Sequence, residues 1–161
     1  HTDLVAQLQA RTVSREYEAV VSGVMTGGGL VDQPIGRHPK QRVKMAVVRD
    51  GKEARTHYKV VKRFDGHTHI RLKLETGRTH QIRVHMASIK YPIVGDYTYG
   101  GRFRIHKGVS DQLRESLQHF GRQALHARAL GLVHPARGEY VSWETELTED
   151  MQNLLVALKE G

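Results

Sequence analysis

Apolar and polar residues alternate in the middle of the chain, which is the pattern of strands that bury one face. One alternating run spans residues 54–64 and a second spans 67–75, with the pair Asp65-Gly66 between them. Asp-Gly pairs are typical of two-residue hairpin turns, and another pair, Asp50-Gly51, follows a shorter apolar run at 43–48. The pattern therefore predicts about three antiparallel strands in two hairpins, with one apolar face and one basic face.

Helices are expected where apolar residues recur every three or four positions. Over residues 79–89, such a stripe is formed by Ile82, His85, Met86 and Ile89, while Arg83 lies at its edge. Further helices are predicted at 3–10, 111–120 and 148–158, and further strands at 17–21, 123–134 and 140–143. Hairpins and scattered helices in 161 residues predict a single α+β domain, in which helices flank a mostly antiparallel mixed sheet.

The net charge of the chain indicates what kind of partner this domain binds. There are 25 Lys and Arg residues against 17 Asp and Glu, which gives a net charge of +8. Such an excess favours a polyanion, most often nucleic acid, although a soluble protein with a basic surface has the same balance. The sequence has no cysteine, which excludes thiolate metal sites, and no apolar run long enough to span a membrane.

Two segments concentrate these positive charges. Residues 34–44 are basic, interrupted by proline and predicted to be extended, as a strap along a phosphate backbone or as a solvated loop. Charge and the motif described next favour the strap. Residues 102–108 alternate basic and apolar side chains. This pattern fits a loop that contacts RNA and a disordered loop equally well. The candidate RNA contacts in these segments are Arg37, His38, Lys40, Arg42, Lys44, Arg102 and Arg104.

The motif at residues 74–85 gathers cations at the start of a predicted helix. It reads Leu-Glu-Thr-Gly-Arg-Thr-His-Gln-Ile-Arg-Val-His, with a turn at Thr76-Gly77 and a helix opening near Thr79. Unpaired N–H groups and the helix dipole favour anions at such a start. The candidate RNA contacts within the motif are Arg78, His80, Gln81 and His85.

Two other patterns do not indicate a site. The run Gly27-Gly28-Gly29 is followed by no Gly-Lys-Ser or Gly-Lys-Thr, so it predicts a mobile turn and not a phosphate-binding loop. The spacing of His80 and His85 does not match a zinc-ligand pair, and no metal site is expected. The residues alone therefore support a basic α+β domain that binds nucleic acid, and nothing more specific.

The motif resembles the signature of the RluA-type pseudouridine synthases, together with Pro-Ile-Val-Gly-Asp at 92–96 and Tyr-Gly at 99–100. Similar segments at 15–20, 31–39, 122–127 and 134–138 extend the resemblance over almost the whole chain. The resemblance is greatest to members that modify bacterial large-subunit ribosomal RNA.

This resemblance implies an isomerase that converts specific uridines to pseudouridine in large-subunit (23S) ribosomal RNA, without a cofactor or a metal. It implies that Tyr17 lies against the target base and helps to remove the C5 proton, and that Arg83 pairs with a catalytic aspartate. The expected partner is ribosomal RNA in the large subunit, with no membrane, for a monomer in the cytoplasm.

The family's catalytic aspartate belongs to an Arg-Leu-Asp motif that this sequence lacks. Asp65 and Asp96 lie in other segments, and neither is assigned as the nucleophile. We therefore expect residues 1–161 to be one partial catalytic domain that is inactive alone. The alternative is a non-catalytic, basic RNA-binding module associated with the ribosome.

Overall fold

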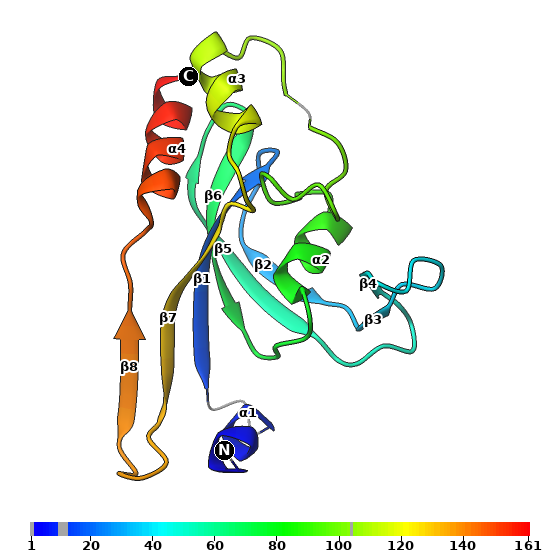
Figure 1. The fold of residues 1–161 in the computed structure, drawn as a ribbon, viewed down its shortest axis with the longest axis vertical. Helices are drawn as coiled ribbons and strands as arrows, with labels where there is room; N and C mark the ends of the chain where they lie inside the picture. The colour runs from blue at the N-terminus through cyan, green and yellow to red at the C-terminus, as the bar shows by residue number, and fades with distance from the viewer. Residues whose placement is uncertain (1, 10–12, 104) are drawn as a thin grey trace.

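The structure is a computed structural model that describes residues 2–9, 13–103 and 105–161. It contains a six-stranded sheet with the order β2-β5-β6-β1-β7-β8 and a two-stranded sheet of β3 and β4 (Figure 1). The strands are β1 (Ser14–Ser22), β2 (Gly29–Asp32), β3 (Ile35–Arg37), β4 (Met45–Val47), β5 (Arg55–Arg63), β6 (His67–Leu74), β7 (Leu125–Val133) and β8 (Tyr140–Glu144). The helices are α1 (Thr2–Gln9), α2 (Gln81–Ser88), α3 (Asp111–Gln118) and α4 (Glu149–Glu160). The predicted α+β fold is confirmed, and the strand pairs are antiparallel.

Strand β1 lies inside the large sheet, and the apolar residues near its end are buried on both faces. Residues 19–21 are fully buried, and the strand pairs with β6 on one side and with β7 on the other. Tyr17 lies where this buried part begins, directly across from Leu72 of β6 and Ala127 of β7. The predicted catalytic tyrosine is therefore fixed from both sides by the sheet.

Helix α2 is buried on two sides. Ile82 and Met86 pack into the main core, whereas Val84 packs into a second cluster with Ile35 and Ala54. The helix therefore lies between the large sheet and the β3–β4 hairpin (Figure 1). It begins at Gln81, two residues later than predicted, because His80 has a left-handed backbone with φ of 55°.

Helices α3 and α4 pack against each other at one end of the large sheet, at the top of Figure 1. Leu113 and Leu117 of α3 meet Met151 and Leu154 of α4 in the main core. The longest helix is α4 with 12 residues, and no helix in the described ranges is long and apolar enough to cross a membrane.

The predicted pairing of residues 43–48 with the two long strands is wrong. This run contains β4, which pairs with β3, and the strand beside β5 is β2, which begins at the last residue of the glycine run. Only Val31 is buried in β2, so the strand has no apolar run that the sequence pattern could reveal. The glycine run serves the close approach of two strands, since a Cβ atom at Gly28 would lie 2.7 Å from the carbonyl oxygen of Tyr58.

The predicted extended strap at residues 34–44 is also wrong for its second half. The main-chain N–H of His38 donates to the carbonyl of Lys44 at 2.9 Å. The His38 ring Nδ1 accepts from the main-chain N–H groups of Lys40 and Gln41 at 3.1 and 3.0 Å. Residues 38–44 therefore form the folded tip of a hairpin. We call residues 35–47 the basic hairpin.

Replacing Gly28 with alanine should weaken the attachment of β2 to the sheet. The added methyl group meets the β5 main chain, so we expect Gly28→Ala to lower the free energy of unfolding by about 1–3 kcal/mol. Gly27→Ala is the matched control, because a Cβ atom there has no neighbour within 4 Å. Urea unfolding curves measure both, and equal midpoints for the two variants would contradict the close approach.

Candidate active site

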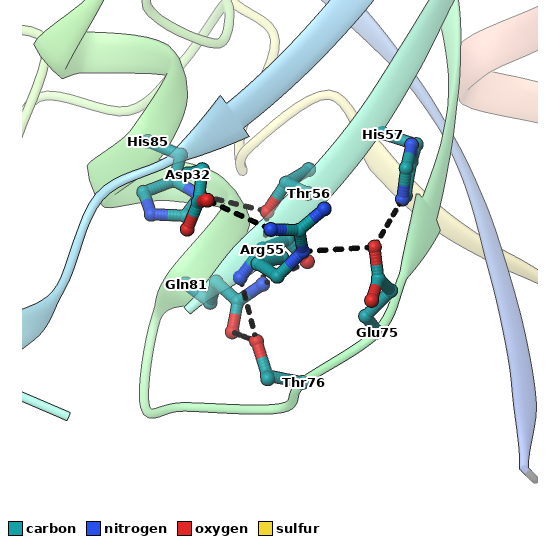
Figure 2. A network of polar contacts seen from close by, with 8 residues as sticks. All are labelled: Asp32, Arg55, Thr56, His57, Glu75, Thr76, Gln81 and His85. Carbon is teal, nitrogen blue, oxygen red and sulfur yellow. Dashed lines mark hydrogen bonds and ion pairs between the residues drawn. The ribbon is translucent and has the colours of Figure 1, made fainter. Parts of the chain in front are cut away.

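A chain of buried hydrogen bonds holds the turn between β6 and α2 (Figure 2). The Thr76 hydroxyl donates to Gln81 Oε1 at 2.7 Å, and Gln81 Nε2 donates to Thr56 Oγ1 at 2.9 Å. The same Oε1 accepts from the main-chain N–H of Arg78 at 3.0 Å, and Nε2 also donates to the carbonyl of Arg55 at 3.0 Å. All the donors and acceptors of one side-chain amide are therefore used to fix this turn.

His85 continues this chain toward β2. Its Nε2 lies 2.9 Å from the carbonyl oxygen of Gln33, which only accepts, so Nε2 carries the proton and Nδ1 accepts from the Thr56 hydroxyl at 2.8 Å. Burial lowers the pKa of His85, which favours this neutral form. His85 is 0% and Gln81 3% exposed, so neither side chain can reach an RNA strand. The predicted RNA contacts at these two positions are wrong, because both side chains hold the turn from inside.

Ion pairs tie the outer side of the same network together. Arg55 Nη1 lies 2.7 Å from Asp32 Oδ2, and Arg55 Nε lies 3.0 Å from Glu75 Oε2. Hydrogen bonds from His57 and then Arg55 lower the pKa of Glu75 to about 2. Strands β2 and β5 and the end of β6 are thereby joined where the motif leaves the sheet (Figure 2).

Arg83 has a carboxylate partner within this chain. Its Nε and Nη2 donate to the two carboxylate oxygens of Asp96 at 2.9 and 3.1 Å, and this pairing raises the pKa of Arg83. Asp96 is 3% exposed and also accepts from the main-chain N–H of Tyr99 at 3.2 Å. The Arg83 guanidinium group lies over the Tyr99 ring, 4.9 Å from its centroid. Two-point pairing and ring stacking together fix both the position and the plane of the guanidinium group.

Tyr99 also joins α2 to the basic hairpin. Its hydroxyl group lies 2.8 Å from His80 Nδ1 and accepts from the main-chain N–H of Met45 at 3.1 Å. Beside it, the Lys44 ammonium donates to the carbonyl of Thr98 at 3.1 Å. The hairpin that carries many of the predicted RNA contacts is therefore attached to the loop that orients Arg83.

The predicted RNA contacts fall into separate places. Arg37, Lys40 and Arg42 are exposed on the basic hairpin, and His38 and Lys44 are half-buried there. A cavity of about 500 Å³, which we call the hairpin groove, separates this hairpin from the turn before α2, and its cationic lining residues are Arg37, Lys52 and Arg78. Arg102 is exposed beside a different cavity of about 250 Å³, and Arg104 lies outside the described residues.

Tyr17 and Arg83 lie on different elements. Tyr17 is half-buried on β1, and within the described part of the chain no hydrogen bond or ring contact joins it to Arg83 on α2. No three His, Asp or Glu side chains among the described residues come close enough to hold a metal ion.

Comparison with known proteins identifies the family. The model of a family described as RNA pseudouridylate synthase matches residues 1–88, which is more than half of the chain. The chain belongs to the RNA pseudouridylate synthase family. The predicted resemblance is therefore confirmed.

Relatives of the chain carry a common name within this synthase family. The chain is 62% identical, over 99% of its length, to ribosomal large subunit pseudouridine synthase D of Pseudomonas aeruginosa, and 56% identical, over 98%, to the protein of that name from Yersinia pestis. It covers 50% and 49% of these two proteins, so it spans about half the length of the relatives it matches.

Solved structures of the synthase family have the same fold. Human RNA pseudouridylate synthase domain containing 4 superimposes with a TM-score of 0.77 at 25% identity, over 98% of this chain and 67% of the other. Human RNA pseudouridylate synthase domain containing 1 gives 0.70 at 24% identity, over 98% and 70%. The architecture described above is thus that of a synthase domain.

Sequence reasoning did not identify Asp96 as a partner of Arg83. The sequence pattern gives Asp96 no role, whereas its buried carboxylate orients the arginine. The available signal was the Gly95-Asp96 pair in a segment shared with the synthases. The roles of Tyr17 and Arg83 in the reaction stay predictions.

Removing the charge of Asp96 should destabilise the fold far more than removing the charge of Asp65. Asp96→Asn leaves the Arg83 guanidinium without its buried partner, so we expect a loss of about 3 kcal/mol in the free energy of unfolding. Asp65 has an 83% exposed side chain at a hairpin turn, so Asp65→Asn should change stability by less than about 0.5 kcal/mol. Urea unfolding measures both, and similar losses would contradict a structural role of the Asp96 pair.

Proposed function

We propose that the protein containing this chain isomerises specific uridines to pseudouridine in large-subunit (23S) ribosomal RNA. The observation that carries the proposal is the 62% identity, over 99% of the chain, to a protein named ribosomal large subunit pseudouridine synthase D. The net charge of +8 and the exposed cations of the basic hairpin agree with an RNA substrate.

In the proposed reaction the N1–C1′ glycosidic bond of uridine breaks. The uracil turns and forms a C5–C1′ bond, C5 loses its proton, and N1 gains one, so the product is an isomer of the substrate. A uridine in a stacked helix must first be flipped out, which costs a few kcal/mol. Phosphate contacts from the basic hairpin and from Arg78 offset this cost.

Arg83 is proposed to hold the carboxylate of a catalytic aspartate that lies outside this chain. The bonds to Asp96 use Nε and Nη2 of Arg83, and Nη1 donates to no described residue. Asp96 and the Tyr99 ring thus present Nη1 to a second carboxylate, which a guanidinium partner keeps ionised. Tyr17 is proposed to lie against the flipped base and to help remove the C5 proton.

Residues 1–161 are proposed to form part of a catalytic domain that does not turn over alone. We propose that the complete protein is a cytoplasmic monomer. The aspartate of its Arg-Leu-Asp motif would be the catalytic carboxylate that pairs with Arg83. The absence of that motif from the sequence also favours the second candidate, a non-catalytic RNA-binding module of the ribosome.

Tritium release separates the two candidates. Large-subunit ribosomal RNA carrying C5-tritiated uridine is incubated with this chain and with the complete protein encoded by its reading frame. We expect release by the complete protein only. Tight binding without release by either protein would support the RNA-binding module, and release by this chain alone would return Asp65 and Asp96 to consideration.

Conservative variants of the complete protein test the two residues. Arg83→Lys keeps the charge beside Asp96 but loses the two-point geometry, so we expect at least about a hundredfold slower tritium release with little loss of RNA affinity. Tyr17→Phe should also bind RNA and fail to release tritium. Arg114→Lys and Tyr140→Phe alter exposed residues and serve as controls. Equal losses of affinity and rate at position 83 would make Arg83 a phosphate contact.

A further inference from the structure

Arg15 occupies a distinctive place beside Tyr17. Arg15 lies two positions before Tyr17 on β1, with a register shift against β7 between Glu16 and Tyr17, and the charge of Tyr17 acts on the Arg15 guanidinium group. The Arg15 guanidinium group lies directly against the main chain of Gly77, where a Cβ atom would overlap its Nη1. The glycine thus makes room for an arginine between the strand that carries Tyr17 and the turn before α2.

The Arg15 guanidinium group has no hydrogen-bond partner within the described ranges. Its Nε is buried without a hydrogen bond, and its Nη nitrogens donate to no described residue. Burial lowers the pKa of Arg15, and the nearby charge of Arg78 lowers it further against the opposing effect of Tyr17. A buried donor is costly without a partner, so the geometry indicates a missing acceptor.

Arg78 directly follows Gly77 in the chain, and its charge acts on the Arg15 guanidinium group. Its Nε donates to the carbonyl of Glu53 at 2.7 Å, which fixes the guanidinium group, and its two Nη nitrogens donate to no described residue. Arg78 also lines the hairpin groove with Arg37 and Lys52, where Asp50 is the acidic lining residue. Gly77 therefore contacts Arg15 and also lines the groove that holds Arg37, Lys52 and Arg78.

We propose that Arg15 and Arg78 form a binding site for one phosphate of the substrate RNA strand, next to the nucleotide that lies at Tyr17. Two planar guanidinium groups with unused N–H donors match the two non-bridging oxygens of a phosphodiester. The strand then continues into the hairpin groove, where Arg37 and Lys52 face the following phosphates. This assignment rests on the proposed function, because that function places a uridine at Tyr17.

Affinity and its salt dependence test the two arginines. The binding partner is a ribosomal RNA fragment that contains a target uridine of the complete protein. In the complete protein, Arg15→Gln and Arg78→Gln should each weaken binding to this fragment about tenfold. Each should also reduce the slope of log affinity against log salt by about 0.7. Arg114→Gln, an exposed arginine on α3, should change neither quantity. Unchanged affinity and slope for both Gln variants would overturn the site.

A second variant separates binding from folding. Gly77→Ala keeps both charges but pushes the Arg15 guanidinium group away, so it should weaken RNA binding like Arg15→Gln. Arg15→Gln removes a desolvated charge, so its midpoint of thermal unfolding should equal or exceed that of the parent protein. Weaker binding accompanied by a lower midpoint in both variants would assign Arg15 a structural role and overturn the proposal.

Neutral backbone substitution locates the phosphate. RNA fragments carry a single methylphosphonate at each position around the uridine in turn. At one position beside the uridine, the losses of binding free energy caused by the methylphosphonate and by Arg15→Gln should not be additive. At the other positions the two losses should be additive. Additive losses at every position would mean that Arg15 meets another partner, such as a carboxylate of the protein, and would overturn the site.

Tritium release is measured in parallel on the same RNA fragment without methylphosphonate, carrying C5-tritiated uridine. Release by the parent protein, combined with additive losses everywhere, overturns the phosphate site and leaves the proposed function standing. No release overturns the proposed function, and with it the assignment of this phosphate to a substrate strand.

Discussion

The structure depends on how one buried amide connects a strand to a helix. Gln81 bonds to Thr76 and Thr56 and to two main-chain groups, so the turn has one geometry relative to β5. Losing one of these bonds would leave a buried polar group without a partner, which costs more than an exposed hydrogen bond contributes. Because this turn starts α2, the direction in which Arg83 projects depends on a network of buried side chains.

Much of the fold could be predicted because periodicity reports burial. Strands β5 and β6 alternate clearly, and the Asp65-Gly66 turn between them has a strong local signal. Strand β2 has one buried residue and begins at the last of three consecutive glycines, so nothing local separates it from a loop. Its position depends on the approach of Gly28 to β5, a contact distant in sequence.

The candidate site was predictable in composition but not in arrangement. The sequence shows that arginine and histidine gather in one motif, yet it does not show which of them face solvent. Gln81 looks like a polar surface residue, and His85 is a candidate RNA contact although it shares the stripe of Ile82 and Met86. Both are buried, because Thr56 and Gln33 supply hydrogen-bond partners from other parts of the chain. Arg15 is a single arginine before the predicted strand and has no local signal, since its place depends on the close approach to Gly77, more than sixty residues later.

The Tyr99 hydroxyl group has a consequence for how related sequences can diverge. It bonds to the ring of His80 but to the main chain of Met45. A main-chain N–H is present whatever side chain stands at position 45, with proline the exception. Positions 80 and 99 are therefore expected to change together during evolution, while position 45 drifts without breaking the link between hairpin and helix.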